Sequence, residues 1–320
     1  MTNTSAGCTE ERDGLPTMLF VRDYRRFSGG HLKYCDHLAH VAARGRFRPL
    51  LHVTPESNIR ELDALVPPGI ERVELPLHCD AIFVAGTDWA ILDSHGQDTD
   101  VCPVVNLIQG VRHADPSLPL FSHLNRPALR ICVSREVADA IQTTGRVSGP
   151  VQVIENGLDH AWLSTFRKPG RKNACFVAGL KDPVLAKAVG RELSALGIAN
   201  EVLAEPLPRK EYLSRLANFE LAVLLPLRAE GFYLPALEAM ALGVNVVMPD
   251  CIGARAFAVD GETCSIALRE PVALAGTAAR LFADRDRADR MRGNARIMSR
   301  RYDIEMERRE LNDAIDGWIR

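Results

Sequence analysis

The chain has 320 residues, of which 47% are hydrophobic and 25% are charged. This length suits two domains of about 150 residues, each able to bury its own core. The 39 Lys and Arg residues against 41 Asp and Glu give a formal net charge of −2. That balance argues against a dedicated nucleic-acid-binding protein, because such proteins usually carry a clear basic excess.

The cysteines and the apolar runs indicate in which cellular compartment the protein is expected to work. No C-x-x-C pair occurs among the eight cysteines, so we expect small buried thiols of a reducing cytoplasm and no disulfide or zinc framework. No apolar run approaches the ~18 residues that span a bilayer. Residues 1–16 are unlike a signal peptide and are expected to form a disordered tail. The sequence predicts a cytoplasmic protein, and its arginine-rich C-terminal helices leave a peripheral contact with the inner membrane face open.

The segment 17–158 alternates short apolar runs with amphipathic stretches. Its predicted strands lie at 18–22, 50–54, 80–86, 104–109 and 131–134, and its predicted helices at 31–43, 89–92 and 136–142. Strands that alternate with helices predict a doubly wound parallel sheet, which binds ligands at the carboxyl ends of its strands. Those ends carry Gly29, Gly30, Gln109 and Ser134.

A glycine turn is predicted between the first strand and the first helix. Gly29 and Gly30 would let an anion approach the backbone, and Arg25, Arg26 and Lys33 would surround it with positive charge. An ordinary strand-to-helix turn is the alternative. No G-x-G-x-x-G follows this strand, so the sequence does not support a dinucleotide cofactor.

A second domain, predicted at 159–302, repeats the alternation after a crossover and a basic linker at 167–172. Its predicted strands lie at 175–181, 201–204, 221–225 and 265–268, and its predicted helices at 183–196, 209–218, 235–243, 273–282 and 285–301. Lys181, at the end of the first of these strands, can reach a diphosphate. Lys187 is the second candidate, for which a solvated lysine at a helix start is the alternative.

Residues 219–250 are the most informative stretch and read as strand, loop, helix and strand. Pro235 is expected to begin the helix and Gly243 to end it, so free N–H groups face the preceding loop, where a phosphate could bind. Glu230 in that loop and Glu238 in the first helical turn can both point at such a ligand. Carboxylates accept hydrogen bonds from sugar hydroxyls, so the combination suits a nucleotide-sugar. Simple pairing with the helix dipole is the alternative.

The segment 230–243 resembles the E-x7-E signature of retaining GT-B glycosyltransferases, the family 4 or group 1 enzymes. The resemblance implies an α/β fold of two Rossmann-like, doubly wound domains that face each other across a cleft, with a C-terminal helix at 303–320 that returns to the first domain. Two positions in the stretch 219–250 depart from the common pattern: Tyr233 stands where Gly is usual, and Asn245 where Pro is usual. Beside Lys181, Leu180 stands where the family more often has Arg.

The same resemblance implies roles for individual residues. Glu230 would meet the transferred sugar, Glu238 the ribose, and Gln109 the sugar and acceptor. His113 is a weaker candidate, because a lone loop histidine is more often a solvated surface residue. The predicted catalytic residues are Glu230, Lys181 and Gln109, and the predicted donor-binding residues are Gly29, Gly30, Lys187, Gly231, Phe232, Tyr233, Leu234 and Glu238, with no metal ligand.

The predicted function is the transfer of a hexosyl or deoxyhexosyl group, with retention, from a nucleoside-diphosphate sugar to an acceptor hydroxyl in bacterial glycan or glycoconjugate biosynthesis. No cofactor is required besides the donor, and no nucleic acid is a partner. Glycan, lipid-linked and small-molecule acceptors stay open. The alternatives are a catalytically silent GT-B module that binds a nucleotide or glycan, and a nucleotide-sugar epimerase or phosphorylase on the same architecture.

Overall fold

The computed structural model describes residues 14–167 and 170–319. Most of the tail predicted at 1–16 and the middle of the linker predicted at 167–172 therefore lie outside the described residues. The chain forms two compact units. The first ends at Ile154 and takes up the chain again from Arg308, and the second is Glu155–Glu307.

The first unit is built on a seven-stranded sheet. Its strands are β1 (Thr17–Arg22), β2 (Arg48–Val53), β3 (Glu71–Arg72), β4 (Ala81–Ala85), β5 (Val104–Ile108), β6 (Leu129–Cys132) and β7 (Val151–Val153). Its helices are α1 (Gly29–Arg44), α2 (Ile59–Asp63), α3 (Asp88–Ser94), α4 (Pro119–Ser122) and α5 (Arg135–Thr143), with 3-10 turns at Val111–Ala114 and His123–Asn125. All five strands predicted before the crossover are present.

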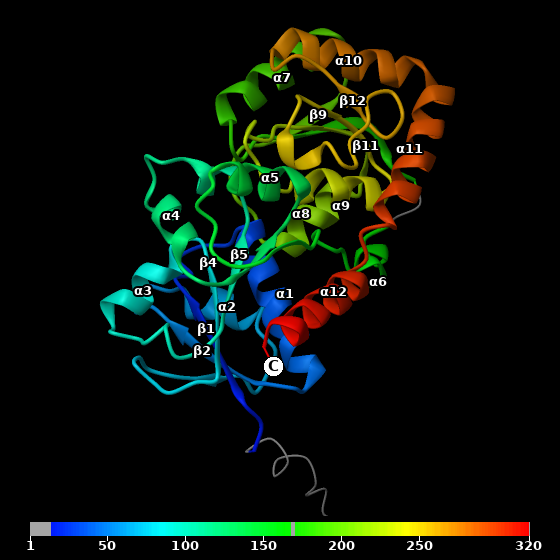
Figure 1. Cartoon of the computed structure of the whole chain (residues 1–320). Coiled ribbons are helices and arrows are strands. Elements are labelled where there is room, and N and C mark those ends of the chain that lie inside the picture. Colours follow the sequence, from blue (N-terminus) through cyan, green and yellow to red (C-terminus); the bar gives the residue numbers. More distant parts are fainter. Residues whose placement is uncertain (1–13, 168–169, 320) are drawn as a thin grey trace, which may run out of the picture. The chain divides into compact units, whose positions relative to one another are not determined.

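Every strand pair of this sheet is parallel, in the order β3-β2-β1-β4-β5-β6-β7 (Figure 1). Alternate side chains enter opposite faces. Leu19 packs with Trp89 of α3 on one face, whereas Phe20 stacks on Phe83 and meets the edge of Tyr34 from α1 on the other. The strand order reverses between β1 and β4, the kind of switch point where such sheets bind ligands.

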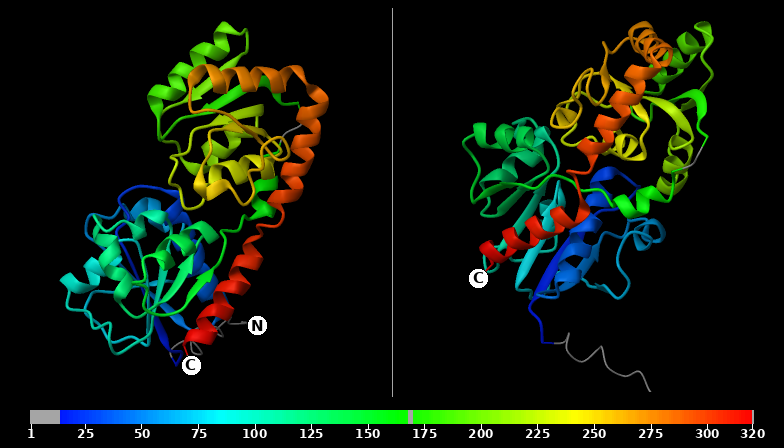
Figure 2. Two further views of the ribbon diagram at one scale, coloured as in Figure 1. Left: turned by 45° about the horizontal axis from the view of Figure 1, so that its top comes forward. Right: turned by 90° about the vertical axis from the view of Figure 1, so that its right-hand side faces the viewer.

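The last helix, α12 (Ile304–Trp318), ends in the first unit. Asp316 accepts a hydrogen bond from Arg44 at 3.0 Å and also pairs with Arg46, just beyond the end of α1. Leu311 and Ile315, one turn apart, are both buried. Figure 2 shows α12 in red, running to the C-terminus in both views.

The second unit contains a five-stranded sheet and most of the remaining helices. Its strands are β8 (Lys172–Ala178), β9 (Asn200–Leu203), β10 (Phe219–Leu224), β11 (Asn245–Met248) and β12 (Ser265–Ile266). Its helices are α6 (His160–Ser164), α7 (Pro183–Ala195), α8 (Arg209–Leu216), α9 (Leu234–Leu242), α10 (Pro271–Ala283) and α11 (Arg285–Ser299), with a 3-10 turn at Ile252–Ala254.

This second sheet is also parallel throughout, in the order β12-β11-β10-β8-β9. Cys175 and Val177 of β8 face α7 and α10. Phe176, between them, packs with residues of α8 and α9 on the opposite face. The prediction of two doubly wound parallel sheets is confirmed. In the second sheet the order reverses between β8 and β10.

Candidate functional site

Lys181 and Glu230 meet at the carboxyl edge of the second sheet. Lys181 follows β8 and Glu230 follows β10, the two strands that flank the switch point. The Lys181 Nζ pairs with Glu230 Oε1, and the same oxygen accepts a hydrogen bond from the backbone N–H of Leu227 at 3.0 Å. The lysine side chain is 43% exposed and the glutamate 15%. Two donors therefore hold the carboxylate, while the cation beside it stays open to a ligand.

The loop before α9 is fixed by the turn that follows β11. The Tyr233 N–H donates to the Gly253 carbonyl at 2.8 Å. A Cβ atom on Gly253 would lie 2.5 Å from the Gly231 carbonyl carbon and from the Phe232 nitrogen. The buried Tyr233 ring lies beneath the ammonium of Lys181, 5.8 Å from centroid to Nζ. Close packing thus sets the position of this backbone.

The helix α9 begins one residue earlier than predicted. Leu234 is its first residue and Pro235 its second, Gly243 ends it in the left-handed conformation, and no side chain caps its N-terminus. Its first N–H groups therefore face the loop that holds Glu230, as an anion site at a helix start requires.

Glu238 is the fifth residue of α9, so it lies in the second turn, and the prediction of a first-turn position is wrong. Its side chain is only 6% exposed and accepts a hydrogen bond from Arg209 at 2.6 Å. The ion pair provides the counter-charge that a buried carboxylate requires.

Arg209, the first residue of α8, was not among the predicted site residues. Its guanidinium lies over the ring of Trp162 in α6, 4.5 Å from Cζ to the ring centroid. Locally, Arg209 resembles any arginine at the start of an amphipathic helix. Its partner Glu238 is 29 positions later in the chain, and no periodicity links the two.

Arg269 is a second residue that the sequence reasoning missed. It donates to the Pro226 carbonyl at 2.5 Å and to Asp182 at 2.9 Å, and so ties the loop after β10 to the loop after β8. Lys187, in contrast, is exposed on α7, and Leu180 is exposed beside Lys181.

In the first unit, Gly30 and Gln109 come together at the carboxyl edge of the sheet. The Gln109 Nε2 donates to the Gly30 carbonyl at 3.0 Å, and a Cβ atom on Gly30 would lie 3.0 Å from Gln109 Oε1. The sequence singled out both residues, and the structure places one against the other.

The predicted glycine turn is wrong. Gly29 and Gly30 are the first two residues of α1, and neither has a positive φ. Ser28 caps the helix by accepting a hydrogen bond from the His31 N–H at 3.2 Å. Lys33 is buried and pairs with Asp36 at 2.8 Å, so it is not the exposed cation that was expected beside the glycines.

His113 is buried, which corrects the expectation of a solvated loop residue. It lies in the 3-10 turn after β5 and is 4% exposed. Burial lowers the pKa of its imidazole to about 3, and the charges of Arg112 and Arg130 act in the same direction. The ring is therefore neutral at physiological pH.

A buried ion pair occupies the switch point of the first sheet. Arg22, at the end of β1, donates to Asp88 in α3 at 3.0 Å, and the Ala85 N–H donates to the same carboxylate at 2.9 Å. Burial raises the pKa of the Asp88 carboxyl to about 6 although Arg22 acts against it. This pair joins the carboxyl ends of β1 and β4.

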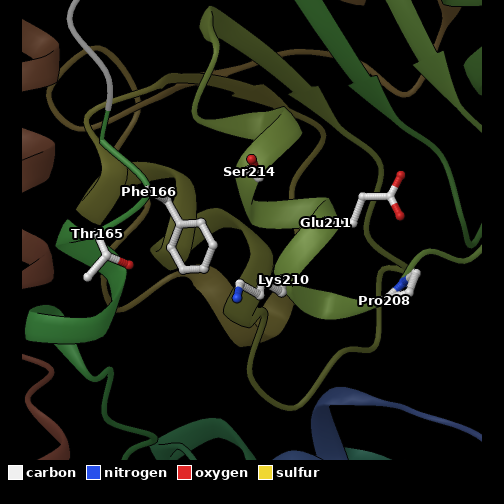
Figure 3. Close-up of a pocket in the computed structure, with 6 residues that line it drawn as sticks. All are labelled: Thr165, Phe166, Pro208, Lys210, Glu211 and Ser214. Atoms are coloured by element: carbon white, nitrogen blue, oxygen red, sulfur yellow. The ribbon is translucent and has the colours of Figure 1, made fainter.

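A pocket of about 490 Å³ lies elsewhere in the second unit, and its lining includes none of the predicted site residues. Figure 3 shows Lys210, Glu211 and Ser214 of α8 with Phe166 and Thr165 from the chain after α6. Arg209 is not part of its lining.

Within residues 14–167 and 170–319, no group of His, Cys, Asp and Glu side chains has an arrangement that could hold a metal ion. Over the same residues, none of the helices has both the length and the apolar character that crossing a membrane demands.

One known protein family resembles part of the second unit. The model of the family described as "Glycosyl transferases group 1" matches residues 160–284, which lie wholly in the second unit. The matched segment contains Lys181, Glu230 and Glu238. A search of curated protein sequences gives no significant match.

Three solved structures illustrate the similarity of fold. Anabaena Alr3699/HepE in complex with UDP-glucose has a TM-score of 0.72 at 16% identity, covering 94% of this chain and 100% of that one. Sucrose-phosphate synthase from Thermosynechococcus elongatus has a TM-score of 0.67 at 12% identity, with coverages of 94% and 98%. A putative UDP-N-acetylglucosamine 2-epimerase from Listeria monocytogenes has a TM-score of 0.60 at 14% identity, with coverages of 95% and 96%. The chain therefore has the GT-B fold that its sequence predicted.

Proposed function

We propose that the protein is a glycosyltransferase that takes a nucleoside-diphosphate sugar and transfers the sugar to an acceptor hydroxyl. One observation carries the proposal. The second unit gathers an exposed ammonium, an uncapped helix start and two carboxylates at the carboxyl edge beside its switch point. The match of residues 160–284 to the glycosyl transferases group 1 family supports it.

The diphosphate would bind between Lys181 and the first N–H groups of α9. Residues 231–234 form the backbone that leads into this helix. Negative charge grows on the diphosphate as the bond to the sugar breaks, so donors fixed in advance stabilise the transition state without proton transfer. The exposed Lys187 of α7 is a second cation for the same group.

The two carboxylates would accept hydrogen bonds from hydroxyl groups of the donor. Glu230 would orient and polarise the transferred sugar, and Glu238 would accept hydrogen bonds from the ribose. In the structure, Glu230 is paired with Lys181. Binding of the diphosphate would give the lysine a second anionic partner and free part of the carboxylate for the sugar.

The remaining expectations from the sequence belong to the same proposal. Transfer would proceed with retention, and no metal would be needed because Lys181 and the helix start supply the positive charge. In the first unit, Gln109 would act on the sugar and acceptor, and Gly29 and Gly30 would approach the phosphates. Bacterial glycan or glycoconjugate biosynthesis is the proposed setting.

The test combines a binding screen and a turnover assay. UDP, GDP and ADP sugars would be screened by thermal shift, because a ligand that binds the folded state raises the melting temperature by mass action. The best donor would then be incubated with protein, and release of nucleoside diphosphate would be measured with and without sugar acceptors. Glu230→Gln is expected to lower the release about a hundredfold or more while it leaves the melting temperature nearly unchanged. Unchanged turnover would remove Glu230 from the mechanism.

A nucleotide-sugar epimerase is the second candidate, since the Listeria protein described as a putative epimerase shares the fold along 95% of this chain. An epimerase would convert a nucleotide-sugar in the absence of any acceptor, giving the epimeric sugar. Product analysis by NMR separates the two reactions.

A further inference from the structure

Four side chains, Glu238, Arg209, Trp162 and Phe166, contact one another in sequence, and the proposed function uses only Glu238. Arg209 from α8 donates to Glu238 Oε1 at 2.6 Å. Trp162 from α6 lies under the Arg209 guanidinium at 4.5 Å. Trp162 meets Phe166 edge-on, with ring centroids 4.8 Å apart. The chain of contacts that begins at the Glu238 carboxylate thus joins α9, α8, α6 and the turn after α6.

Arg209 binds one carboxylate oxygen of Glu238, and the other oxygen can accept a hydrogen bond from a ligand. Among the described residues, Oε1 accepts from Arg209 and no donor contacts Oε2. The hydroxyl of Tyr212 is buried in the same core and has no hydrogen-bond partner among the residues that the structure describes. Burial raises the pKa of Tyr212, with a further contribution from the charge of Glu238. Glu238 Oε2 and the Tyr212 hydroxyl therefore both have unused hydrogen-bonding capacity in this part of the second unit.

We infer that Arg209 is a positioning residue, which fixes Glu238 so that its second oxygen accepts hydrogen bonds from the ribose hydroxyls of the donor. This inference rests on the proposed function and adds to it a residue outside the E-x7-E segment. The guanidinium supplies the counter-charge that makes a buried carboxylate tolerable, and the ring of Trp162 fixes the guanidinium.

Arginine suits this position better than lysine. A guanidinium is planar, so it can lie flat on the indole while its edge donates to the carboxylate. A lysine ammonium can pair with Glu238 but has no flat face to stack, and its flexible stem orients the carboxylate less well. Arg209→Lys should therefore rescue only part of what Arg209→Ala loses.

The experiment measures dissociation constants by calorimetry for two ligands, the nucleoside diphosphate among UDP, GDP and ADP that the wild type binds most tightly and its 2′,3′-dideoxy form. Arg209→Ala is expected to weaken binding of the ribose ligand about tenfold and binding of the dideoxy ligand less than twofold. Arg209→Lys should fall between the wild type and Arg209→Ala. Glu238→Gln should discriminate between the ligands in the same way as Arg209→Ala.

Arg215→Ala is the matched control. Arg215 lies on the same helix and forms an ion pair with Glu211 at 2.5 Å, on the exposed side. The Arg215→Ala variant should leave the dissociation constants of both ligands unchanged. If Arg209→Ala does not fold, the affinities for the ribose and dideoxy ligands are compared in two other variants. One is Arg209→Lys. The other is the double variant Arg209→Met with Glu238→Gln, which contains no unpaired charge.

Each outcome is decisive. Equal losses for both ligands in the Arg209 variants would overturn the inference, because they would indicate a contact with phosphate or a general loss of structure. Unchanged affinity for the ribose ligand would overturn it as well. If the wild type binds none of the three diphosphates, the proposed function fails and the inference with it.

Discussion

Lys181 is the residue whose replacement best separates recognition of phosphate from recognition of the nucleoside. Its ammonium is exposed and pairs with Glu230. Lys181→Met keeps the length of the side chain and removes its charge. We expect the affinity for the nucleoside diphosphate that the wild type binds most tightly to fall about tenfold, because a charge-assisted contact is lost, while the affinity for the corresponding nucleoside, which has no phosphate, stays the same. Isothermal titration calorimetry measures both.

An exposed lysine of the same unit provides the control for Lys181. Lys210 lines the pocket of Figure 3, whose lining includes none of the predicted site residues. Lys210→Met should leave binding of the same nucleoside diphosphate unchanged. If both variants lost a comparable amount of affinity, the cause would be the change in net charge. If the dissociation constant of Lys181→Met equalled that of the wild type, Lys181 would not belong to the phosphate site.

At the scale of elements, the turn after β11 supports the loop before α9. A methyl group at position 253 would lie 2.5 Å from backbone atoms of Gly231 and Phe232, so Gly253→Ala must displace one of the two segments. We expect this variant to lose about 1–3 kcal/mol of unfolding free energy, as overpacked sites do. Because the displaced loop holds Glu230, turnover should fall further than stability explains. Urea unfolding and the donor-release assay measure the two effects.

Gly276→Ala is the matched control for Gly253→Ala. Gly276 lies inside α10, and a Cβ atom there would meet nothing closer than the Arg280 guanidinium, at 3.6 Å. Alanine should stabilise the helix by about 1 kcal/mol relative to glycine and leave turnover unchanged. If Gly253→Ala retained full activity, the position of the loop would not depend on this contact.

The elements themselves were largely predictable, but their side-chain partners were not. Buried strands such as β10 are recognisable in the sequence as apolar runs, and Pro235 and Gly243 mark the ends of α9. Both signals depend only on residues close together in the sequence. The pairing of Arg209 with Glu238 depends on where two helices meet after folding. Lys33 shows the same limit, since its burial follows from the face of α1 that packs on the sheet.

At the scale of the whole molecule, the two units should respond differently to acid. Eight of the nine histidines belong to the first unit, at positions 31, 37, 40, 52, 78, 95, 113 and 123, whereas His160 belongs to the second. Burial lowers the pKa of His31 to about 4 and that of His113 to about 3. These imidazoles take up protons on unfolding, so the stability they contribute above pH 6.5 is lost as the pH falls toward 3 to 4.

The titration of Asp88 stabilises the first unit as the pH falls, so it reduces the loss of stability that the histidines cause. Its pKa in the folded protein is about 6, against 3.8 for the free side chain, so between these values the folded state binds the extra proton. Asp88 begins to offset the histidines' loss of stability as the pH approaches 6, and it offsets a larger part below pH 6. We expect the first unit to lose about 2 kcal/mol of unfolding free energy between pH 7 and 5. The second unit should change less.

Hydrogen exchange followed by mass spectrometry resolves the two units, because peptides from core strands report the local free energy of opening. After correction for intrinsic exchange, protection of β4 and β5 should fall between pH 7 and 5, and protection of β10 and β11 should not. His113→Leu removes the most deeply buried of the shifted imidazoles and should flatten the response of β5 in particular. If β10 and β11 lose protection as steeply as β4 and β5, acid acts through groups common to both units, and the buried histidines of the first unit do not set its stability.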